Sequence, residues 1–147
     1  VQRLTRLARE LGVAHQVQVR GRVCRDELPA LLRSADAVAC APWYEPFGIV
    51  PLEAMACGVP MLGTAVGGLC DTVVHGQTGL LVPARSPVEL ARAMGELLDD
   101  PARRAAFGAA GVKRVRRRFT WSRVAEQTMA TYHQLLAGRT LTSEVLP

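Results

Sequence analysis

The sequence predicts an α/β fold in which a parallel sheet is flanked by helices. Short apolar runs typical of strands alternate with segments of helical periodicity, which is the pattern of βαβ units. The run 36–41 (DAVACA) is continuously small and apolar, as in a parallel strand buried on both faces. A chain of 147 residues, 49% hydrophobic and 21% charged, is ordinary for a globular domain, which excludes wholesale disorder. No apolar run approaches the roughly 18 residues of a membrane span.

Glycine, proline and small polar residues punctuate the elements. Four strands are expected, at residues 16–20, 36–41, 60–64 and 80–82. Helices are expected at residues 3–11, 28–35, 49–57, 88–98, 101–117 and 121–136, with a short one from Gly67-Gly68 to about His75. The expected N-caps are Asp26, Ser86, Asp100 and Thr120, and the expected C-terminal caps are Gly12 and Gly58. Residues 1–138 are then expected to form one domain, and 139–147 a loose tail.

The cysteines favour a reducing compartment. The four are Cys24, Cys40, Cys57 and Cys70, and none forms a C-x-x-C pair or lies at a spacing typical of zinc ligands. We therefore expect free, structural thiols and no metal site. No basic stretch followed by an apolar core opens the sequence, so we expect no signal peptide and, by default, a cytoplasmic location.

The segment 45–60 carries the candidate binding chemistry. It follows the predicted strand 36–41, and ligands of parallel α/β sheets bind beyond the carboxyl ends of the strands. The helix expected to begin near Gly48 offers free backbone N–H groups and the positive end of its dipole, which suits a phosphate. Gly48 itself lets an anion approach the backbone closely.

Two carboxylates flank this expected phosphate site. Glu53 lies more than one turn into the helix, where a carboxylate can accept two hydrogen bonds from a vicinal diol such as ribose. Glu45 lies before the helix, where it can accept hydrogen bonds from the hydroxyls of a sugar. Two carboxylates on either side of an anion site suit a nucleoside diphosphate sugar.

The same residues resemble a known family. Glu45, seven intervening residues and Glu53 match the E-x7-E motif of the retaining, GT-B-fold glycosyltransferases of family 4, also called glycosyl transferases group 1. An ordered series of further segments matches as well: 45–48 (EPFG), 53–60 (EAMACGVP), Gly67-Gly68, 76–83 (GQTGLLVP) and 119–121 (FTW). Over nearly its whole length the sequence is similar to the C-terminal, donor-binding half of that fold, a Rossmann-like parallel sheet with flanking helices.

The resemblance implies a role for each matching position. Glu53 would hold the ribose hydroxyls and Glu45 the donor sugar. The backbone amides of Phe47, Gly48 and Ile49 would meet the diphosphate and the sugar, the backbone of Val23 would lie beside the base, and Gly67 and Gly68 would open a loop close to the donor. Transfer in this family retains the anomeric configuration and needs no tightly held metal, and this sequence has no Asp-x-Asp.

The resemblance also implies that part of the active site lies outside these residues. The family's phosphate-binding Arg and Lys belong to a first strand–helix unit, which would precede Val1, and the acceptor-binding N-terminal domain would precede that. The intact protein is expected to transfer a hexose from a nucleoside diphosphate sugar to an acceptor. This segment alone is expected to be half of an active site, unable to turn over.

Two other functions remain open from the sequence. One is a non-catalytic nucleotide-sugar-binding or regulatory module that keeps the fold. The other is a nucleic-acid-binding domain that uses the arginine-rich run 103–118. A solvated helix face is the simpler interpretation of that run. Contact of the run with anionic lipid or with an absent domain ranks equally with the nucleic-acid role. We expect no nucleic acid partner and allow a peripheral membrane contact. Trp43 and Tyr44 are expected to pack their loop, with stacking on a base or an acceptor as the alternative. Phe47 is a candidate core anchor for the loop, which is compatible with its role at the site.

Overall fold

The computed structural model describes residues 1–138, which form seven α-helices, one 3-10 helix and a three-stranded sheet within that range. The elements in chain order are α1 (Gln2–Glu10), η1 (Ala14–Gln16), α2 (Leu28–Arg33), β1 (Val38–Cys40), α3 (Ile49–Ala56), β2 (Met61–Thr64), α4 (Gly68–Thr72), β3 (Gly79–Val82), α5 (Pro87–Asp99), α6 (Pro101–Arg118) and α7 (Trp121–Leu136). The expected tail 139–147 lies outside the described residues.

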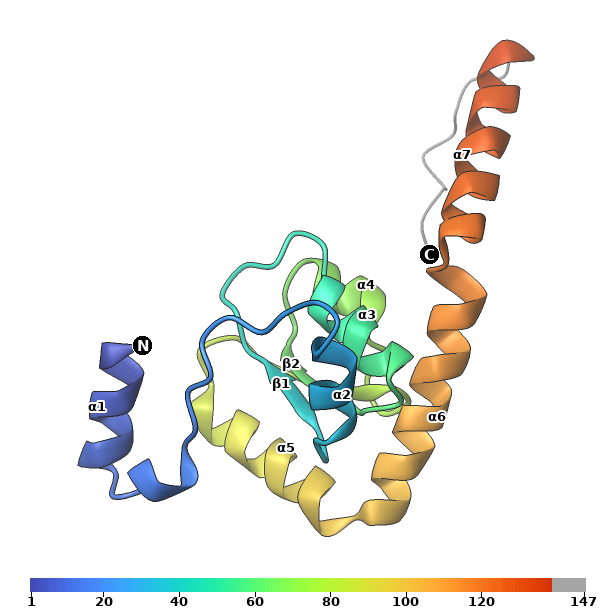
Figure 1. The fold of residues 1–147 in the computed structure, drawn as a ribbon. Coiled ribbons are helices and arrows are strands. Elements are labelled where there is room, and N and C mark those ends of the chain that lie inside the picture. Colours follow the sequence, from blue (N-terminus) through green and yellow to red (C-terminus); the bar gives the residue numbers. More distant parts are fainter. Residues whose placement is uncertain (139–147) are drawn as a thin grey trace.

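The sheet is parallel, with helices on both faces, as the sequence predicts. Its order is β1-β2-β3, and helices α3 and α4 make the two crossovers (Figure 1). Every residue of the central strand β2 is buried. Leu62 packs with Leu97 of α5 and Phe107 of α6, while Met61 packs with Met55 of α3 on the other side. The α/β prediction is therefore confirmed.

The predicted strand at 16–20 is wrong. Ala14–Gln16 is a 3-10 helix, and residues 17–24 have no regular secondary structure. Val17 and Val19, whose alternation suggested a strand, are 46% and 45% exposed. A strand needs a hydrogen-bonding neighbour, and within residues 1–138 β1 pairs only with β2, so no strand lies beside this segment.

The strand predicted at 36–41 forms, but it is shorter and less buried than expected. β1 spans three residues, of which Val38 and Cys40 are half-buried and Ala39 is exposed. Among the described residues β1 is an edge strand, so one flank and part of one face stay open to solvent. The small apolar residues of the run indicated the strand correctly but not its place at the edge.

Three of the four predicted N-cap residues are confirmed, and two of these also make a side-chain cap bond. The Asp100 carboxylate accepts from the Arg103 N–H at 2.8 Å, and the Thr120 hydroxyl accepts from the Arg123 N–H at 3.3 Å. Asp26 is wrong, because α2 begins after Glu27, and Glu27 makes no side-chain cap bond either. Ser86 is the N-cap residue of α5, as predicted, but its hydroxyl donates to the Ala84 carbonyl and makes no cap bond.

Gly58 ends helix α3, as predicted. It has φ +78°, in the left-handed region that glycine adopts without strain. Its N–H donates to the Met55 carbonyl and the N–H of Val59 to the Ala54 carbonyl, both at 3.0 Å. These two bonds make a Schellman motif, which satisfies the last carbonyls of the helix.

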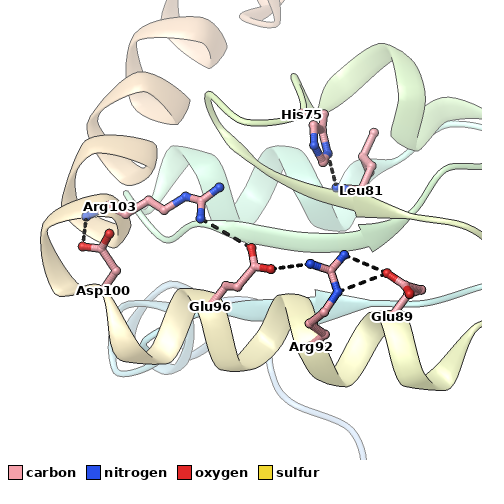
Figure 2. Close-up of polar contacts among 7 residues, drawn as sticks. All are labelled: His75, Leu81, Glu89, Arg92, Glu96, Asp100 and Arg103. Atoms are coloured by element: carbon pink, nitrogen blue, oxygen red, sulfur yellow. Dashed lines mark hydrogen bonds and ion pairs between the residues drawn. The ribbon is translucent and has the colours of Figure 1, made fainter.

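Helices α5 and α6 are tied together along their polar sides. Arg92 binds Glu89 at 2.7 Å and Glu96 at 2.6 Å, and the other oxygen of Glu96 lies 3.5 Å from Arg103 of α6 (Figure 2).

Figure 2 also shows His75, whose Nδ1 accepts from the Leu81 N–H at 3.0 Å. The ring of His75 therefore ties the turn after α4 to strand β3.

The first and last helices extend away from the sheet (Figure 1). Leu4 and Leu7 of α1, and Leu11 just after it, are 62%, 48% and 65% exposed. Helix α7 continues beyond the body in line with α6, and none of its residues is buried. Among residues 1–138, no helix combines the length and apolar character needed to cross a membrane.

Candidate donor-binding site

Three loops meet at the carboxyl edge of the sheet. They follow β1, β2 and β3, and because the strands are parallel their carboxyl ends lie at the same edge. The Thr64 hydroxyl at the end of β2 donates to the Pro42 carbonyl at 2.7 Å, which joins the first two loops at their roots. The residues that the sequence singles out lie mainly on these two loops.

The loop after β1 leads into α3 through Gly48. This glycine is the N-cap of the helix and has φ +82°, so a side chain here would strain the backbone. A Cβ at this position would also lie 2.9 Å from the Gly68 carbonyl oxygen and 3.0 Å from the Thr72 hydroxyl. The start of α3 is therefore packed closely against α4.

Gly67 and Gly68 complete this contact from the other side. The Gly68 N–H donates to the Glu45 carbonyl at 2.8 Å. A Cβ on Gly67 would collide with that same carbonyl oxygen, and a Cβ on Gly68 would collide with the Phe47 backbone. The structure thus brings Glu45, Phe47, Gly67 and Gly68 together by backbone-to-backbone packing.

The Glu45 carboxylate lies on two backbone amides at the N-terminal end of α3. Its Oε1 accepts from the Gly48 N–H at 2.9 Å and from the Phe47 N–H at 3.3 Å. These are the amides that the resemblance assigns to the diphosphate and sugar. Sequence reasoning missed this arrangement, in which a carboxylate binds amides two and three residues further along the chain, just before the first helical residue, Ile49.

Glu53 lies in α3, about one turn after its first residue, Ile49. It is half-buried, while Pro51, Ala54 and Met55 are buried in the core. Ile49, four residues earlier, is 55% exposed, so Glu53 shares the solvent-facing side of the helix with it. Helical side chains lean toward the N-terminus, which directs the Glu53 carboxylate toward the Ile49 end of the helix.

Val23 lies apart from the other predicted residues. It is half-buried and lines a cavity of about 530 Å³ whose wall includes Arg20, Arg22 and Glu27 but none of the other predicted site residues. Within the described residues, the structure does not join Val23 to the loops after β1 and β2. Its role toward a base stays a prediction.

The aromatic residues of the loop after β1 are exposed. Trp43, Tyr44 and Phe47 are 74%, 77% and 65% exposed, so neither the loop-packing prediction nor the core anchor is correct. The Arg85 guanidinium lies 4.8 Å from the centre of the Trp43 ring, which places a cation at the same sheet edge. Arg85 has φ +59°, a conformation uncommon outside glycine, and the sequence carries no signal that marks it.

The thiols near the site are free. Cys24 and Cys70 are exposed, while Cys40 and Cys57 are half-buried rather than buried. Burial, and secondly the negative charge of Glu45, raise the pKa of the Cys40 thiol. Within residues 1–138, no group of three or more His, Cys, Asp or Glu side chains lies where it could hold a metal ion.

A second, basic cavity of about 590 Å³ lies at the opposite edge of the sheet. It borders residues 74–78, which precede β3, and its wall includes five cationic side chains: Lys113, Arg114, Arg117, Arg118 and Arg123. Arg114 donates to the Thr72 carbonyl at 2.8 Å and to the Asp71 carbonyl at 2.6 Å. Burial, and secondly the charge of Arg118, lower the pKa of Arg114.

The expectation of a solvated face for the run 103–118 is wrong for two of its arginines. Arg114 holds the end of α4. Arg104 donates to the Leu97 and Leu98 carbonyls at 2.8 and 2.6 Å and lies 3.2 Å from Asp36. Part of the basic run therefore joins helices, and the basic cavity shares no residue with the loops at the carboxyl edge.

Comparisons with known proteins agree with this geometry. The D-inositol 3-phosphate glycosyltransferase of Salinispora tropica is 42% identical over 134 residues, which are 91% of this chain and 28% of that protein. The sucrose-phosphate synthase of Thermosynechococcus elongatus superposes with a TM-score of 0.85 at 38% identity, covering 93% of this chain and 34% of the other. Anabaena Alr3699/HepE, solved in complex with UDP-glucose, superposes with a TM-score of 0.83 at 28% identity, covering 90% and 36%.

The chain thus spans about a third of the length of these proteins, and its sheet and helices match the C-terminal half of a GT-B fold. The model of one family, described as glycosyl transferases group 1, matches residues 1–114. The chain therefore belongs to the family of glycosyl transferases group 1.

Proposed function

We propose that the chain is the donor-binding domain of a retaining glycosyltransferase that moves a hexose from a nucleoside diphosphate sugar to an acceptor. One observation carries the proposal: two amides at the start of α3 already hold an anionic group, the carboxylate of Glu45. A pair of N–H groups at a helix N-terminus that binds a carboxylate is suited to a phosphate as well. UDP-glucose bound to the Anabaena relative supports the ligand class.

The proposed roles follow the geometry of the two loops. The amides of Phe47, Gly48 and Ile49 would meet the diphosphate and the sugar, with Gly67 and Gly68 holding them in place from behind. Glu53, leaning toward the same helix end, would accept hydrogen bonds from the ribose hydroxyls. Glu45 would contact the donor sugar, and the backbone of Val23 would lie beside the base.

The chemistry needs charge stabilisation rather than a nucleophile from this chain. As the bond from the sugar to the diphosphate breaks, the leaving diphosphate gains charge, and amides fixed at a helix start stabilise that charge without reorganising. We propose that no metal is required, and that Glu45 and Glu53 act as the E-x7-E pair of the family. No described residue is assigned as a general base.

The complete active site is proposed to need a second domain. The relatives are about three times longer than this chain, and the resemblance places the acceptor site and two phosphate-binding cations in that further part. We therefore propose that these residues bind the donor but do not turn over alone. A cytoplasmic location, with peripheral membrane contact if the acceptor is a lipid, belongs to the same proposal.

Titration calorimetry with UDP-glucose, GDP-mannose and ADP-glucose tests the donor site and identifies the base. Glu53→Ala is expected to weaken binding by about 1.5–3 kcal/mol, the value of a hydrogen bond to a charged group, or roughly 10- to 150-fold. Glu10→Ala removes an exposed carboxylate on α1, away from the site, and is the matched control with unchanged affinity. Equal affinities for Glu53→Ala and the parent chain would contradict the ribose assignment.

A further inference from the structure

The Glu45 side chain occupies donors that the proposed ligand also needs. Its Oε1 accepts from the Gly48 N–H at 2.9 Å and from the Phe47 N–H at 3.3 Å. A backbone N–H has one hydrogen, so it makes one well-aligned hydrogen bond at a time. A diphosphate or sugar oxygen can take these amides only when the carboxylate leaves them.

The backbone around Glu45 does not have room to move with the carboxylate. The Glu45 carbonyl accepts from the Gly68 N–H at 2.8 Å, and a Cβ on Gly67 would collide with it. Gly48 is pressed against the Gly68 carbonyl in the same way. A ligand oxygen can therefore replace the carboxylate on these amides only when the Glu45 side chain rotates, because the amides themselves stay in place.

The two possible ligands offer the displaced carboxylate different partners. A nucleoside diphosphate sugar carries hydroxyls beside the diphosphate, and these can donate to a carboxylate. A bare nucleoside diphosphate offers no donor there, and its terminal phosphate is a second anion within a few ångströms, so the two charges repel. In the complex with the nucleoside diphosphate sugar, the displaced carboxylate regains hydrogen bonds from the sugar hydroxyls. In the complex with the bare diphosphate, it regains none and faces a second negative charge.

We propose that Glu45 is a displaceable cap by which the site distinguishes the sugar-bearing donor from the bare nucleoside diphosphate. This inference rests on the proposed function, because it concerns the same amides. Glu45 disfavours the diphosphate product and returns to the amides as the product leaves. The residue is thus a specificity determinant for the state of the donor, in addition to a contact with the sugar.

Matched ligand pairs test the inference directly. The dissociation constants of UDP and UDP-glucose, and of the GDP and ADP pairs, are measured for the parent chain, Glu45→Gln, Glu45→Ala and Glu53→Ala. Glu45→Ala removes the competing cap and is expected to bind the bare diphosphate about three- to tenfold more tightly, the range of a helix N-cap. It is expected to bind the sugar-bearing donor more weakly. Glu45→Gln keeps an acceptor without the charge, so both of its changes should be smaller.

A second measurement needs no ligand and uses the cap itself. Hydrogen exchange of the Phe47 and Gly48 amides, followed by NMR, is expected to be slow in the parent chain and in Glu45→Gln and fast in Glu45→Ala. Thermal melting of each variant shows that it is folded. Fast exchange of both amides in the folded parent chain would overturn the inference.

The outcomes separate this inference from the proposed function. Tighter binding of the diphosphate with weaker binding of the donor supports the displaceable cap. If the parent chain binds both ligands and Glu53→Ala binds neither, but the Glu45 variants leave the affinity for the diphosphate unchanged or weaker, only the cap is overturned. If the parent chain binds no member of any pair, the donor site is wrong, and the cap falls with it.

Discussion

The two edges of the sheet differ in the atoms that form their surfaces, which are backbone atoms at one edge and side chains at the other. At the carboxyl edge, the loops after β1 and β2 touch through backbone atoms, and three glycines leave no space for a Cβ. At the amino edge, the basic cavity is enclosed largely by long cationic side chains of α6 and α7. Backbone contacts hold each N–H group in a fixed position, whereas long side chains can change rotamer when a ligand or another group approaches. A site for one ligand geometry is expected at the first edge, and not at the second.

Charge alone favours the amino edge, away from the donor site that we propose. The basic cavity has five cationic residues in its wall, whereas the loops at the carboxyl edge carry two carboxylates and a single nearby arginine, Arg85. The anion binding that we propose for the carboxyl edge would rest on amides at a helix start, which contribute nothing to net charge. At the amino edge, Arg114 is already bound to the carbonyls of Asp71 and Thr72.

The largest expected effect is on the glycine contact. Gly68→Ala would drive a methyl group into the Phe47 backbone, and we expect a loss of about 3 kcal/mol in the free energy of unfolding, as for severe overpacking. Gly95→Ala in α5 is the matched control, since nothing lies within 4 Å of its Cβ. It should stabilise the chain by about 0.5–1 kcal/mol through helix propensity. Urea denaturation measures both, and similar stabilities would contradict the backbone contact.

The next effect concerns the basic cavity. Arg114→Ala removes two hydrogen bonds from a charged group to the end of α4, so we expect a loss of about 1.5–3 kcal/mol in stability. Arg117→Ala, in the wall of the same cavity, should change stability by less than about 0.5 kcal/mol. Neither variant should change nucleotide affinity. If both destabilise equally, the charge of the cavity matters more than the individual bonds of Arg114.

A smaller effect separates two sites that look alike in sequence. Asp100 and Ser86 each precede a proline at the start of a helix, but only the Asp100 side chain accepts a helix N–H. Asp100→Ala should lower stability by about 1 kcal/mol, the value of an N-cap, at the start of the helix that carries four of the five cationic residues of the basic cavity. Ser86→Ala should be close to neutral. The two chemical denaturation curves would contradict the cap assignment if they coincide.

The smallest effect is on the reactivity of a thiol at the carboxyl edge. Burial and the charge of Glu45 raise the pKa of Cys40 above its ordinary value of 9.0, so the folded chain favours the neutral thiol. This contribution to stability is present below pH 9 and is lost as the pH rises through the raised pKa. Glu45→Gln removes the second cause, so the Cys40 thiol should be alkylated at a lower pH than in the parent chain. The exposed Cys70 is the internal control, and an unchanged pH profile for Cys40 would contradict the influence of Glu45.

Local patterns predicted most of the fold. The alternation of strands and helices, the glycine at the end of α3 and the caps Asp100 and Thr120 could all be identified from neighbouring residues. The segment 16–20 could not, because whether Val17 and Val19 form a strand depends on a neighbouring strand and not on their own alternation. Asp26 and Ser86 had suitable side chains, but local backbone geometry gave the helix N–H groups no bond to them.

Most of the residues that the sequence predicted for the site meet at the carboxyl edge, with Val23 as the exception, but the arrangement of their side chains was not predicted. Glu45, Phe47, Gly48, Gly67 and Gly68 were identified by their resemblance to a family, and the structure brings them together. That the Glu45 carboxylate lies on the amides depends on a side-chain rotamer, which residue identity does not encode. The positive φ of Arg85, and its place over Trp43, depend on the path of the loop after β3 in the same way.

Amide NMR during titration with UDP-glucose tests the difference between the two edges most directly. We predict that the shifts cluster at residues 45–53 and 67–68, that residues 113–118 stay unchanged, and that Glu53→Ala strongly weakens the response. Shifts centred on 113–118 would place the anion site in the basic cavity, and an unchanged titration of Glu53→Ala would remove the ribose contact. The first result would contradict a donor site built from backbone amides at the carboxyl edge, and the second would contradict the role of Glu53 in it.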